Sequence, residues 1–309
     1  MFKWNRIVVA LVGIPLLVFI YTNMAFKGLP LLIFSLFVVG VGLNEFYNMI
    51  IFSGKEVYKK IGIITGLLVV LLTYYDSIKT YYLLGSEQIN PSKFMPSFFI
   101  EKFNLSVFNL LILIVIILLI YRVLKNKIKR SLESVSYTIF GVIYVAIFFS
   151  QIINLYFTDY KHYQISGIAP KITMIMILQI LVWVSDTAAG SVGVTIGRRF
   201  FKNGFTEISP KKSVEGAIGS LIFTGLASVI LTMIMANFSF GSISIIKSFI
   251  VGVILSVVAQ IGDLIESLFK RECGVKDSGT ILMGHGGILD RFDSMLLVLP
   301  VFSYLISLL

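Results

Sequence analysis

Long apolar runs recur along the whole chain, and they constrain its fold more than any other feature of the sequence. Each is long enough, or nearly so, to cross the hydrocarbon core of a bilayer as a helix. We predict about nine such runs, over residues 7–22, 30–50, 61–75, 105–121, 135–157, 171–193, 214–238, 245–268 and 295–309. A mean hydropathy of +0.93 and a charged fraction of only 14% also set the chain apart from soluble globular proteins. We therefore expect an all-α integral membrane protein with about nine transmembrane helices.

The basic residues indicate which way these helices cross the membrane. If the N-terminus lies in the cytoplasm, 19 of the 26 Lys and Arg residues fall in cytoplasmic segments and only 7 on the opposite side. This bias is typical of cytoplasmic loops, so we predict a cytoplasmic N-terminus in a multi-pass protein of the cell (plasma) membrane. The net charge of +10 follows largely from the same bias. We expect it to attract anionic headgroups, which makes the lipid bilayer, and no nucleic acid, the partner of the charged loops.

Polar residues are distributed differently in the two halves of the chain. Residues 1–130 are predicted to form an N-terminal transmembrane scaffold, and residues 131–309 a C-terminal transmembrane catalytic region, because three polar clusters interrupt the second half. In the first half, the carboxylate of Glu45 either has a role within the membrane or, more simply, caps a helix end at the interface. The basic run from Arg122 to Arg130 is expected to be a solvated anchor that faces the lipid.

The first polar cluster is WVSDTAAGSVGVTIGRRF, residues 183–200. Asp186 is predicted to lie about one turn inside an apolar helix, among small residues that let neighbouring helices approach closely. A carboxylate in hydrocarbon is costly, and such residues usually serve a function. The alternative is a helix-packing face with one stray carboxylate.

The second cluster is ISPKKSVEGAIGS, residues 208–220. Here Ser209 is predicted to be the N-cap of a helix, with a proline as the first helical residue. Lys211 and Lys212 add two ammonium groups to the free N–H groups of that helix start, and together they favour a phosphate. The alternative is an ordinary capped helix start with lysines on the cytoplasmic side. At i, i+4 spacing, Glu215 is also a candidate ion-pair partner of Lys211.

The third cluster extends from the eighth apolar run into the loop that follows it. Asp263 is expected at or below the level of the headgroups, and Asp290 and Asp293 are expected to share one face of the last helix. Carboxylates with few His residues and no set of thiolates suit Mg²⁺, which is usually held by one or two carboxylates plus substrate phosphates. The glycines would leave room for a phosphate, and the Lys and Arg residues would balance its charge. The alternative, a solvated cytoplasmic turn, does not account for the buried acid.

The three clusters together predict phosphoryl or nucleotidyl transfer. That chemistry depends on positioning and charge neutralisation more than on a covalent nucleophile. All three clusters fall on the cytoplasmic side of the predicted topology. We therefore expect a lipid as the acceptor and a cytosolic nucleotide as the donor.

Residues 267–293, SLFKRECGVKDSGTILMGHGGILDRFD, resemble the signature of the phosphatidate cytidylyltransferases, the CDP-diacylglycerol synthases. That signature runs Ser-x-apolar-Lys-Arg, then Lys-Asp, a glycine-rich turn with His-Gly-Gly, and Asp-Arg-apolar-Asp. The chain matches it with Ser267, Lys270, Arg271, Lys276, Asp277, Gly279, His285, Gly286, Gly287, Asp290, Arg291 and Asp293. The Ser-Asp-Thr of the first cluster and the Ser-Pro-Lys-Lys of the second also resemble this family.

The resemblance implies that CTP and phosphatidate give CDP-diacylglycerol and pyrophosphate in an Mg²⁺-dependent reaction, with K⁺ beside the Mg²⁺, in a homodimer whose active site faces the cytoplasm. The catalytic residues that it implies are Asp263, Asp290, Asp186 and Lys211. The implied metal ligands are Asp263 and Asp290 first, then Asp293 and Asp277. The implied substrate-binding residues are Ser209, Lys211, Lys212, Lys270, Arg271, Lys276, His285, Gly286, Gly287 and Arg291.

The chain departs from the family pattern at four positions. Met283 stands where the family commonly has Pro or Gly, and Val194 stands where it has a basic residue. Gly190 and Val214 occupy positions that are usually aromatic. None of these departures removes a carboxylate or a lysine, so they bear on contacts with the nucleotide base and on rate more than on the type of reaction.

Two other functions fit parts of the pattern. An ion-coupled transporter would use intramembrane carboxylates as an ion path. In such a protein we would expect acids near the middle of the membrane and two halves of the chain related by an internal repeat. Here the acids lie toward one surface and the sequence shows no repeat. A CDP-alcohol phosphotransferase needs an Asp-Gly-x-x-Ala-Arg…Gly-x-x-x-Asp-x-x-x-Asp array, which does not occur in this sequence.

Overall fold

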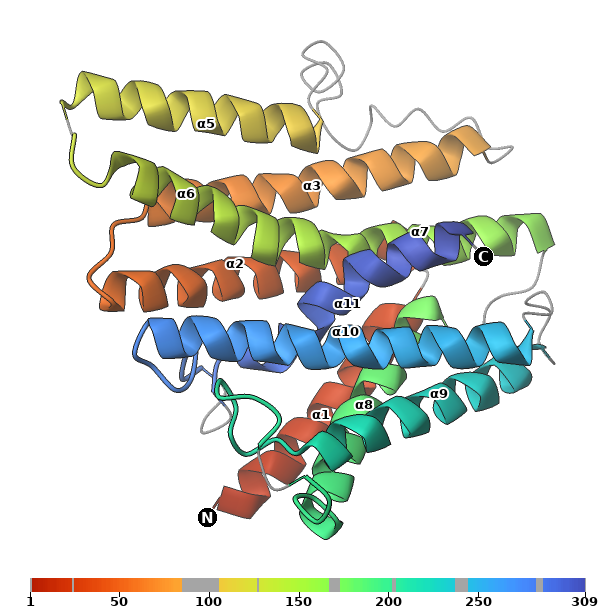
Figure 1. Ribbon diagram of the computed structural model, residues 1–309. Helices are drawn as coiled ribbons and strands as arrows, with labels where there is room; N and C mark the ends of the chain where they lie inside the picture. Colours follow the sequence, from red (N-terminus) through yellow and green to blue (C-terminus); the bar gives the residue numbers. More distant parts are fainter. Residues whose placement is uncertain are drawn as a thin grey trace. The chain divides into compact units, whose positions relative to one another are not determined.

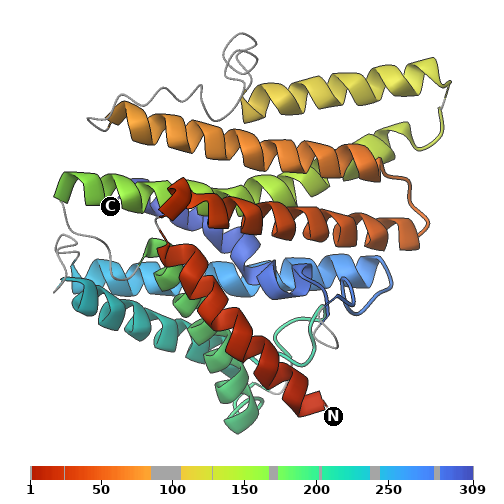
Figure 2. The ribbon, with the colours of Figure 1, turned by 180° about the vertical axis from the view of Figure 1, so that it is seen from behind.

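The computed structural model describes residues 2–23, 25–84, 106–126, 128–166, 173–201, 204–236, 244–281 and 286–308. All regular structure within these ranges is helical, which confirms the predicted all-α class (Figures 1 and 2). The elements are α1 (Phe2–Thr22), η1 (Ala25–Gly28), α2 (Leu29–Phe52), α3 (Lys59–Leu84), α5 (Val107–Leu124), α6 (Ser131–Gly141), η3 (Val142–Ile147), α7 (Phe148–Ser166), α8 (Met174–Thr195), α9 (Val214–Ala236), α10 (Ile245–Glu272) and α11 (Leu289–Leu308).

Seven helical segments in the described ranges are long and apolar enough to cross a membrane. They are Leu29–Phe52, Lys59–Thr80, Val107–Leu124, Ser131–Thr158, Met174–Thr195, Val214–Ile234 and Ile245–Glu272. The first and last predicted runs are helical as well, as α1 and α11, but they are not among these seven. A bilayer leaves the backbone no water to bond with, so each apolar run satisfies its own N–H and C=O groups as a helix. The cytoplasmic N-terminus stays a prediction.

The chain forms two compact units. Unit 1 comprises Met1–Gly167 and Cys273–Asp290, and unit 2 comprises Ile168–Glu272 and Arg291–Leu309. In unit 1 the helices α6 and α7 pack with α2 and α3, because apolar side chains of all four helices share one core. The two units therefore do not follow the predicted scaffold and catalytic regions, and that functional division stays a prediction.

Unit 1 packs around α2 and α3, which run side by side in both views (Figures 1 and 2). Tyr47 of α2 is fully buried, and its hydroxyl donates a hydrogen bond of 2.7 Å to the carbonyl of Thr138 in α6. Gly62 and Gly141 lie against this side chain, where a Cβ atom at either position would clash with it. Small residues thus allow three helices to close around one large side chain.

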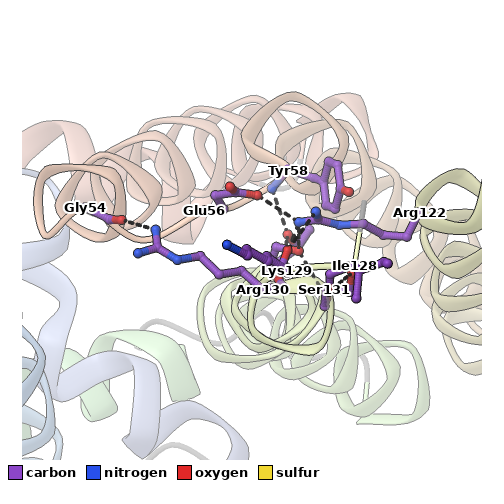
Figure 3. Close-up of polar contacts among 10 residues, drawn as sticks. Gly54, Glu56, Tyr58, Arg122, Ile128, Lys129, Arg130 and Ser131 are labelled. Carbon is purple, nitrogen blue, oxygen red and sulfur yellow. Dashed lines mark hydrogen bonds and ion pairs between the residues drawn. The ribbon is translucent and has the colours of Figure 1, made fainter. Parts of the chain in front are cut away.

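The loops at one end of unit 1 are joined by a buried arginine (Figure 3). Arg122 of α5 is only 5% exposed, and its guanidinium donates to the Glu56 carboxylate at 3.0 Å and to the carbonyls of Lys129 and Arg130 at 3.5 and 3.4 Å. Arg130 in turn donates to the carbonyl of Gly54 at 2.7 Å. The expectation of a solvated basic run is therefore wrong for Arg122, because a guanidinium can satisfy several loop acceptors at once.

Unit 2 is built on α8, α9 and α10, with α9 and α10 side by side in Figure 1. Ser185, Ser220 and Ser256, one from each helix, form a buried cluster. Their hydroxyl oxygens lie 2.8 Å apart for Ser185 and Ser220, 3.0 Å for Ser185 and Ser256, and 2.8 Å for Ser220 and Ser256. Interhelical hydrogen bonds of this kind hold membrane helices together where apolar burial gives no driving force.

Candidate functional site

The residues that the sequence marks as functional are divided between the two units. Unit 2 contains Asp186, Ser209, Lys211, Lys212, Asp263, Lys270, Arg271, Arg291 and Asp293. Unit 1 contains Lys276, Asp277, Gly286, Gly287 and Asp290. The predicted phosphate-binding residue His285 and the departure at Met283 lie outside the described residues.

In unit 2, an ion pair joins the second and third polar clusters. The ammonium of Lys212 lies 2.5 Å from Oδ2 of Asp263, and the two side chains are 29% and 31% exposed. The other carboxylate oxygen of Asp263 accepts a hydrogen bond of 3.4 Å from the hydroxyl of Ser267, the first residue of the signature. The predicted phosphate lysine and the predicted metal ligand are thus each other's partners in this structure.

Asp186 and Asp293 lie close enough to Asp263 for their charges to interact. Burial and the neighbouring carboxylates of Asp263 and Asp186 raise the pKa of Asp293 to about 7. Both causes oppose the ionised form, whereas a bound cation would favour it. Three of the predicted acids, one from each of α8, α10 and α11, therefore interact electrostatically within unit 2. Their role as a functional site stays a prediction.

The donor chemistry of this cluster fits Mg²⁺. Asp186, Asp263 and Asp293 supply hard carboxylate oxygens, which this ion prefers. No group of three or more His, Cys, Asp or Glu side chains forms a ready-made metal site among the described residues. Mg²⁺ does not need one, since it usually takes one or two carboxylates and completes its shell with water and phosphate oxygens.

The remaining basic residues of the signature differ in their surroundings. Lys270 forms an ion pair with the fully buried carboxylate of Glu266, one helical turn earlier. Lys211, Arg271 and Arg291 are exposed. Lys270 is therefore engaged with Glu266 inside unit 2, and the side chains of the other three lie at the surface of that unit. Lys276 and Asp277, in unit 1, are exposed too.

The predicted helix start at Ser209 is wrong. Helix α9 begins at Val214, and the hydroxyl of Ser213 accepts a hydrogen bond of 3.1 Å from the N–H of Gly216. Ser213 is thus the N-cap, because its hydroxyl satisfies a donor of the first turn. Ser209 instead lies in the preceding turn, where its carbonyl accepts a bond of 3.1 Å from the N–H of Lys212.

Glu215 has a different partner from the one that its spacing suggests. Its carboxylate accepts hydrogen bonds from the backbone N–H groups of Arg198, Phe200 and Phe201, at 3.0, 2.8 and 2.9 Å. Lys211 lies outside the helix, so the i, i+4 relation does not exist. The carboxylate therefore holds the residues that follow α8, in the loop to which Lys212, the partner of Asp263, also belongs.

In unit 1, the signature turn is held by two carboxylates. Oδ2 of Asp290 accepts hydrogen bonds from the N–H and the hydroxyl of Ser278, both at 2.9 Å, and from the N–H of Gly287 at 2.7 Å. Glu45 of α2 accepts from the N–H groups of Ile288 and Leu289 at 3.1 and 2.9 Å. Of the two roles considered for Glu45, the structure shows the capping of a helix end, although the helix is α11.

The glycines of the signature lie against these carboxylates. A Cβ atom at Gly279 or Gly287 would clash with Glu45, and one at Gly286 would lie 2.5 Å from Oδ2 of Asp290. Gly286 also has φ of +78°, a conformation that side chains disfavour. The close approach that these glycines permit is therefore to the protein's own acids, and their predicted contact with a substrate phosphate stays a prediction.

Sequence reasoning missed the connection between Glu45 and the signature. The signal was a carboxylate inside an apolar run, which is costly unless it is paired. Its partners lie 243 and 244 positions further along the chain. No local spacing rule connects residues at that separation.

A protein-family model matches nearly the whole chain, and individual known proteins match 41–60% of it. The model of the family described as "Cytidylyltransferase family" matches residues 4–309. A protein of Staphylococcus haemolyticus named "Phosphatidate cytidylyltransferase" is 39% identical over 190 residues, which cover 60% of this chain and 64% of that protein. Proteins of the same name from Bacillus subtilis and Staphylococcus saprophyticus are 35% and 46% identical over 178 and 127 residues. These alignments cover 58% and 41% of this chain, and 60% and 46% of the relatives' own length.

Proposed function

Because the chain belongs to the cytidylyltransferase family, we propose that it transfers the cytidylyl group of CTP to phosphatidate, giving CDP-diacylglycerol and pyrophosphate. The names of its relatives support these substrates. The structural observation that carries the proposal is the group of Asp186, Lys212, Asp263 and Asp293 in unit 2. Three acids on apolar helices, with a lysine from the loop before α9 paired to one of them, suit a charged substrate at a membrane surface better than they suit packing.

The reaction needs little covalent chemistry from the protein. A phosphate oxygen of phosphatidate forms a bond with the α-phosphorus of CTP, and the bond from that phosphorus to the oxygen bridging to the β-phosphorus breaks. Pyrophosphate leaves with the electron pair. Because the attacking oxygen is already anionic, no general base is required. The protein's task is to align the two phosphates and to offset their mutual repulsion.

Mg²⁺ would be held by Asp263 and Asp293 with Asp186 beside them, and when bound it would neutralise charge on the triphosphate. Lys212, released from Asp263, would then contact a phosphate oxygen. The roles of Asp290 and Asp277 as further ligands rest on the family resemblance alone, as does the use of K⁺ beside Mg²⁺.

The exposed basic residues Lys211, Arg271 and Arg291 supply positive charge for the triphosphate and the lipid phosphate. We place the reaction at the cytoplasmic face of the cell membrane, where the positive-inside bias puts these residues and where CTP is available. We also propose a homodimer, on the family resemblance, which the mass of the detergent-solubilised protein measured by light scattering would test.

An assay of the purified protein tests the proposed reaction. The protein in detergent is incubated with labelled CTP, phosphatidate and Mg²⁺, and labelled CDP-lipid and pyrophosphate are measured. Replacing Asp263→Asn should lower kcat by about 100-fold or more, because the amide no longer neutralises or binds a cation. Asp76→Asn, a matched change of an exposed acid in α3, should leave kcat unchanged.

Failure of the wild-type protein to form CDP-lipid would contradict the proposal. Release of CMP from CDP-diacylglycerol and an alcohol would indicate the phosphotransferase reaction instead. Full activity of the Asp263→Asn variant would exclude that residue from the site.

A further inference from the structure

Glu45 is a charged residue that the family signature does not include. It lies about two turns before the end of the apolar helix α2 and is only 2% exposed. Burying a carboxylate in such surroundings is costly unless donors surround it. Its position therefore calls for a compensating set of donors, and the structure shows which ones they are.

The donors come from the start of α11 and the turn before it. Oε1 accepts from the N–H of Ile288 at 3.1 Å, and Oε2 accepts from the N–H of Leu289 at 2.9 Å. The first N–H groups of a helix have no acceptor within the helix, and the N-terminal end of the helix dipole favours a negative charge. A side chain of α2 thus acts as the cap of α11.

Ser278 connects Glu45 to Asp290. Its hydroxyl lies 3.3 Å from Oε2 of Glu45 and 2.9 Å from Oδ2 of Asp290. A hydroxyl has a single proton, so it donates to only one of the two carboxylates at a time. The backbone N–H of Ser278 adds a bond of 2.9 Å to Asp290. Glu45 and Asp290 therefore hold the same short turn from two sides.

The backbone around the Glu45 carboxylate is closely packed. Gly279 and Gly287 place bare backbone against its carboxylate, where a Cβ atom would clash. One turn earlier on α2, a Cβ atom at Gly42 would lie 3.9 Å from Cδ1 of Leu289. The same face of α2 thus receives both the turn and the first residue of α11, so a shift of the Glu45 carboxylate would displace both.

We propose that Glu45 is a positioning residue for cytidylyl transfer. By holding Ser278, Ile288 and Leu289, it fixes the positions of Asp290 and of the glycines Gly286 and Gly287. Its part in catalysis rests on the proposed function, whereas the hydrogen bonds do not. The N-terminal region would accordingly contribute a residue to the chemistry that the sequence assigns to the C-terminal region alone.

Two substitutions separate the negative charge of Glu45 from its shape. Glu45→Gln keeps the shape but replaces one accepting oxygen with an NH₂ group that faces a backbone donor. Glu45→Asp keeps the charge on a shorter side chain. If Glu45 only fills space, Gln is the better substitute. If it holds the turn by its charge, Asp is the better substitute, and Glu45→Gln should lower kcat by about 100-fold, the cost of a misplacement of about 1 Å, with a much smaller change in KM for CTP.

Hydrogen exchange measured by mass spectrometry supplies a readout that needs no activity. The amides of Ile288 and Leu289 should exchange at least about tenfold faster in Glu45→Gln, because a loss of about 1.4 kcal/mol in one charged hydrogen bond corresponds to that factor. Asp76→Asn, an acid-to-amide change on the neighbouring helix α3, should alter neither exchange nor kcat. Elution as a single species from a sizing column shows that each variant is folded.

Ser278→Ala completes the test. If Glu45 and Ser278 act through one turn, the fold-decrease in kcat of the double variant should be well below the product of the fold-decreases of the two single variants. The proposal is overturned if exchange at residues 288 and 289 is unchanged in Glu45→Gln, or if exchange rises while kcat stays at the wild-type value. A wild-type protein that makes no CDP-lipid would refute the proposed function alone, since the exchange comparison would still decide whether Glu45 holds the turn.

Discussion

At the scale of single residues, two carboxylates inside the apolar helices, Glu45 and Asp263, have identifiable partners. Glu45 is bound to backbone donors of α11, and Asp263 to Lys212 and Ser267. Such pairing is expected, because a lone charge in a low-dielectric interior is costly. It also means that a substrate or cation must compete with contacts that the protein already makes.

The ion pair of Lys212 with Asp263 leads to a prediction about cation binding without nucleotide. At contact range and an effective dielectric constant near 20, a unit charge contributes a few kcal/mol, so removing this ammonium should raise the affinity for a divalent cation by at least about tenfold. The affinity of the Lys212→Gln variant for Mn²⁺, measured from the electron paramagnetic resonance signal of the free ion, checks this prediction. Lys211→Gln is the matched control, since Lys211 is exposed and should have a smaller effect. An unchanged Mn²⁺ affinity in Lys212→Gln would show that the Lys212 ammonium does not compete with a cation for Asp263.

At the scale of helices, glycines decide where neighbours can approach. A Cβ atom at Gly216 of α9 would lie 2.6 Å from the carbonyl oxygen of Ala189 in α8, so the two helices cross with backbone against backbone. At Gly190 of α8, by contrast, a Cβ atom would meet nothing within 4 Å. The position where the family usually has an aromatic residue is therefore open in this protein.

This contrast predicts opposite outcomes for two similar substitutions. Gly216→Ala should destabilise the protein by about 1–3 kcal/mol, because the added methyl group must force the helices apart. Gly190→Ala should be neutral or should stabilise it by up to about 1 kcal/mol through helix propensity. Thermal unfolding of both variants in one detergent measures the difference. Equal Tm values for the two variants would mean that α8 and α9 do not cross at Gly216.

At the scale of the whole molecule, the described part of the chain contains seven segments that can span a membrane, and the chain forms two compact units. The chain enters unit 1 twice, since Cys273–Asp290 joins Met1–Gly167. The family signature itself is divided in this way, with Ser267 to Arg271 in unit 2 and Lys276 to Asp290 in unit 1. A functional division into an N-terminal and a C-terminal half is therefore not visible as a division of the fold.

The predicted orientation in the membrane can be tested with single cysteines. In a Cys273→Ala background, which removes the only cysteine, Lys129→Cys and Lys247→Cys place thiols at exposed positions that are predicted to lie on opposite sides. In intact cells, a membrane-impermeant maleimide should label Lys247→Cys only, and Lys129→Cys should react after the membrane is opened. The reverse labelling pattern would overturn the cytoplasmic N-terminus.

Several features of this protein followed from the sequence alone. The apolar runs determined the helical class, because in a bilayer each run can satisfy its backbone only by folding on itself. The residue types of the clusters indicated an acidic and basic site for phosphates, since hard carboxylate oxygens and cationic side chains suit that chemistry. Residue type and predicted topology thus pointed to a phosphate site on the cytoplasmic side, whereas the roles of single residues such as Asp263 and Asp290 came from the family resemblance and stay predictions.

The tertiary structure alone decided which partners these groups have. Local spacing predicted Ser209 as the helix cap, but Ser213 is the cap in the structure. It also predicted Lys211 as the partner of Glu215, whose carboxylate instead accepts hydrogen bonds from backbone N–H groups after α8. Helix periodicity describes neighbours within about one turn of each other, but the partners of a buried carboxylate are set by which helices pack together. For that reason, the bond from Glu45 to the start of α11 depends on the contact between two helices that lie far apart in the chain.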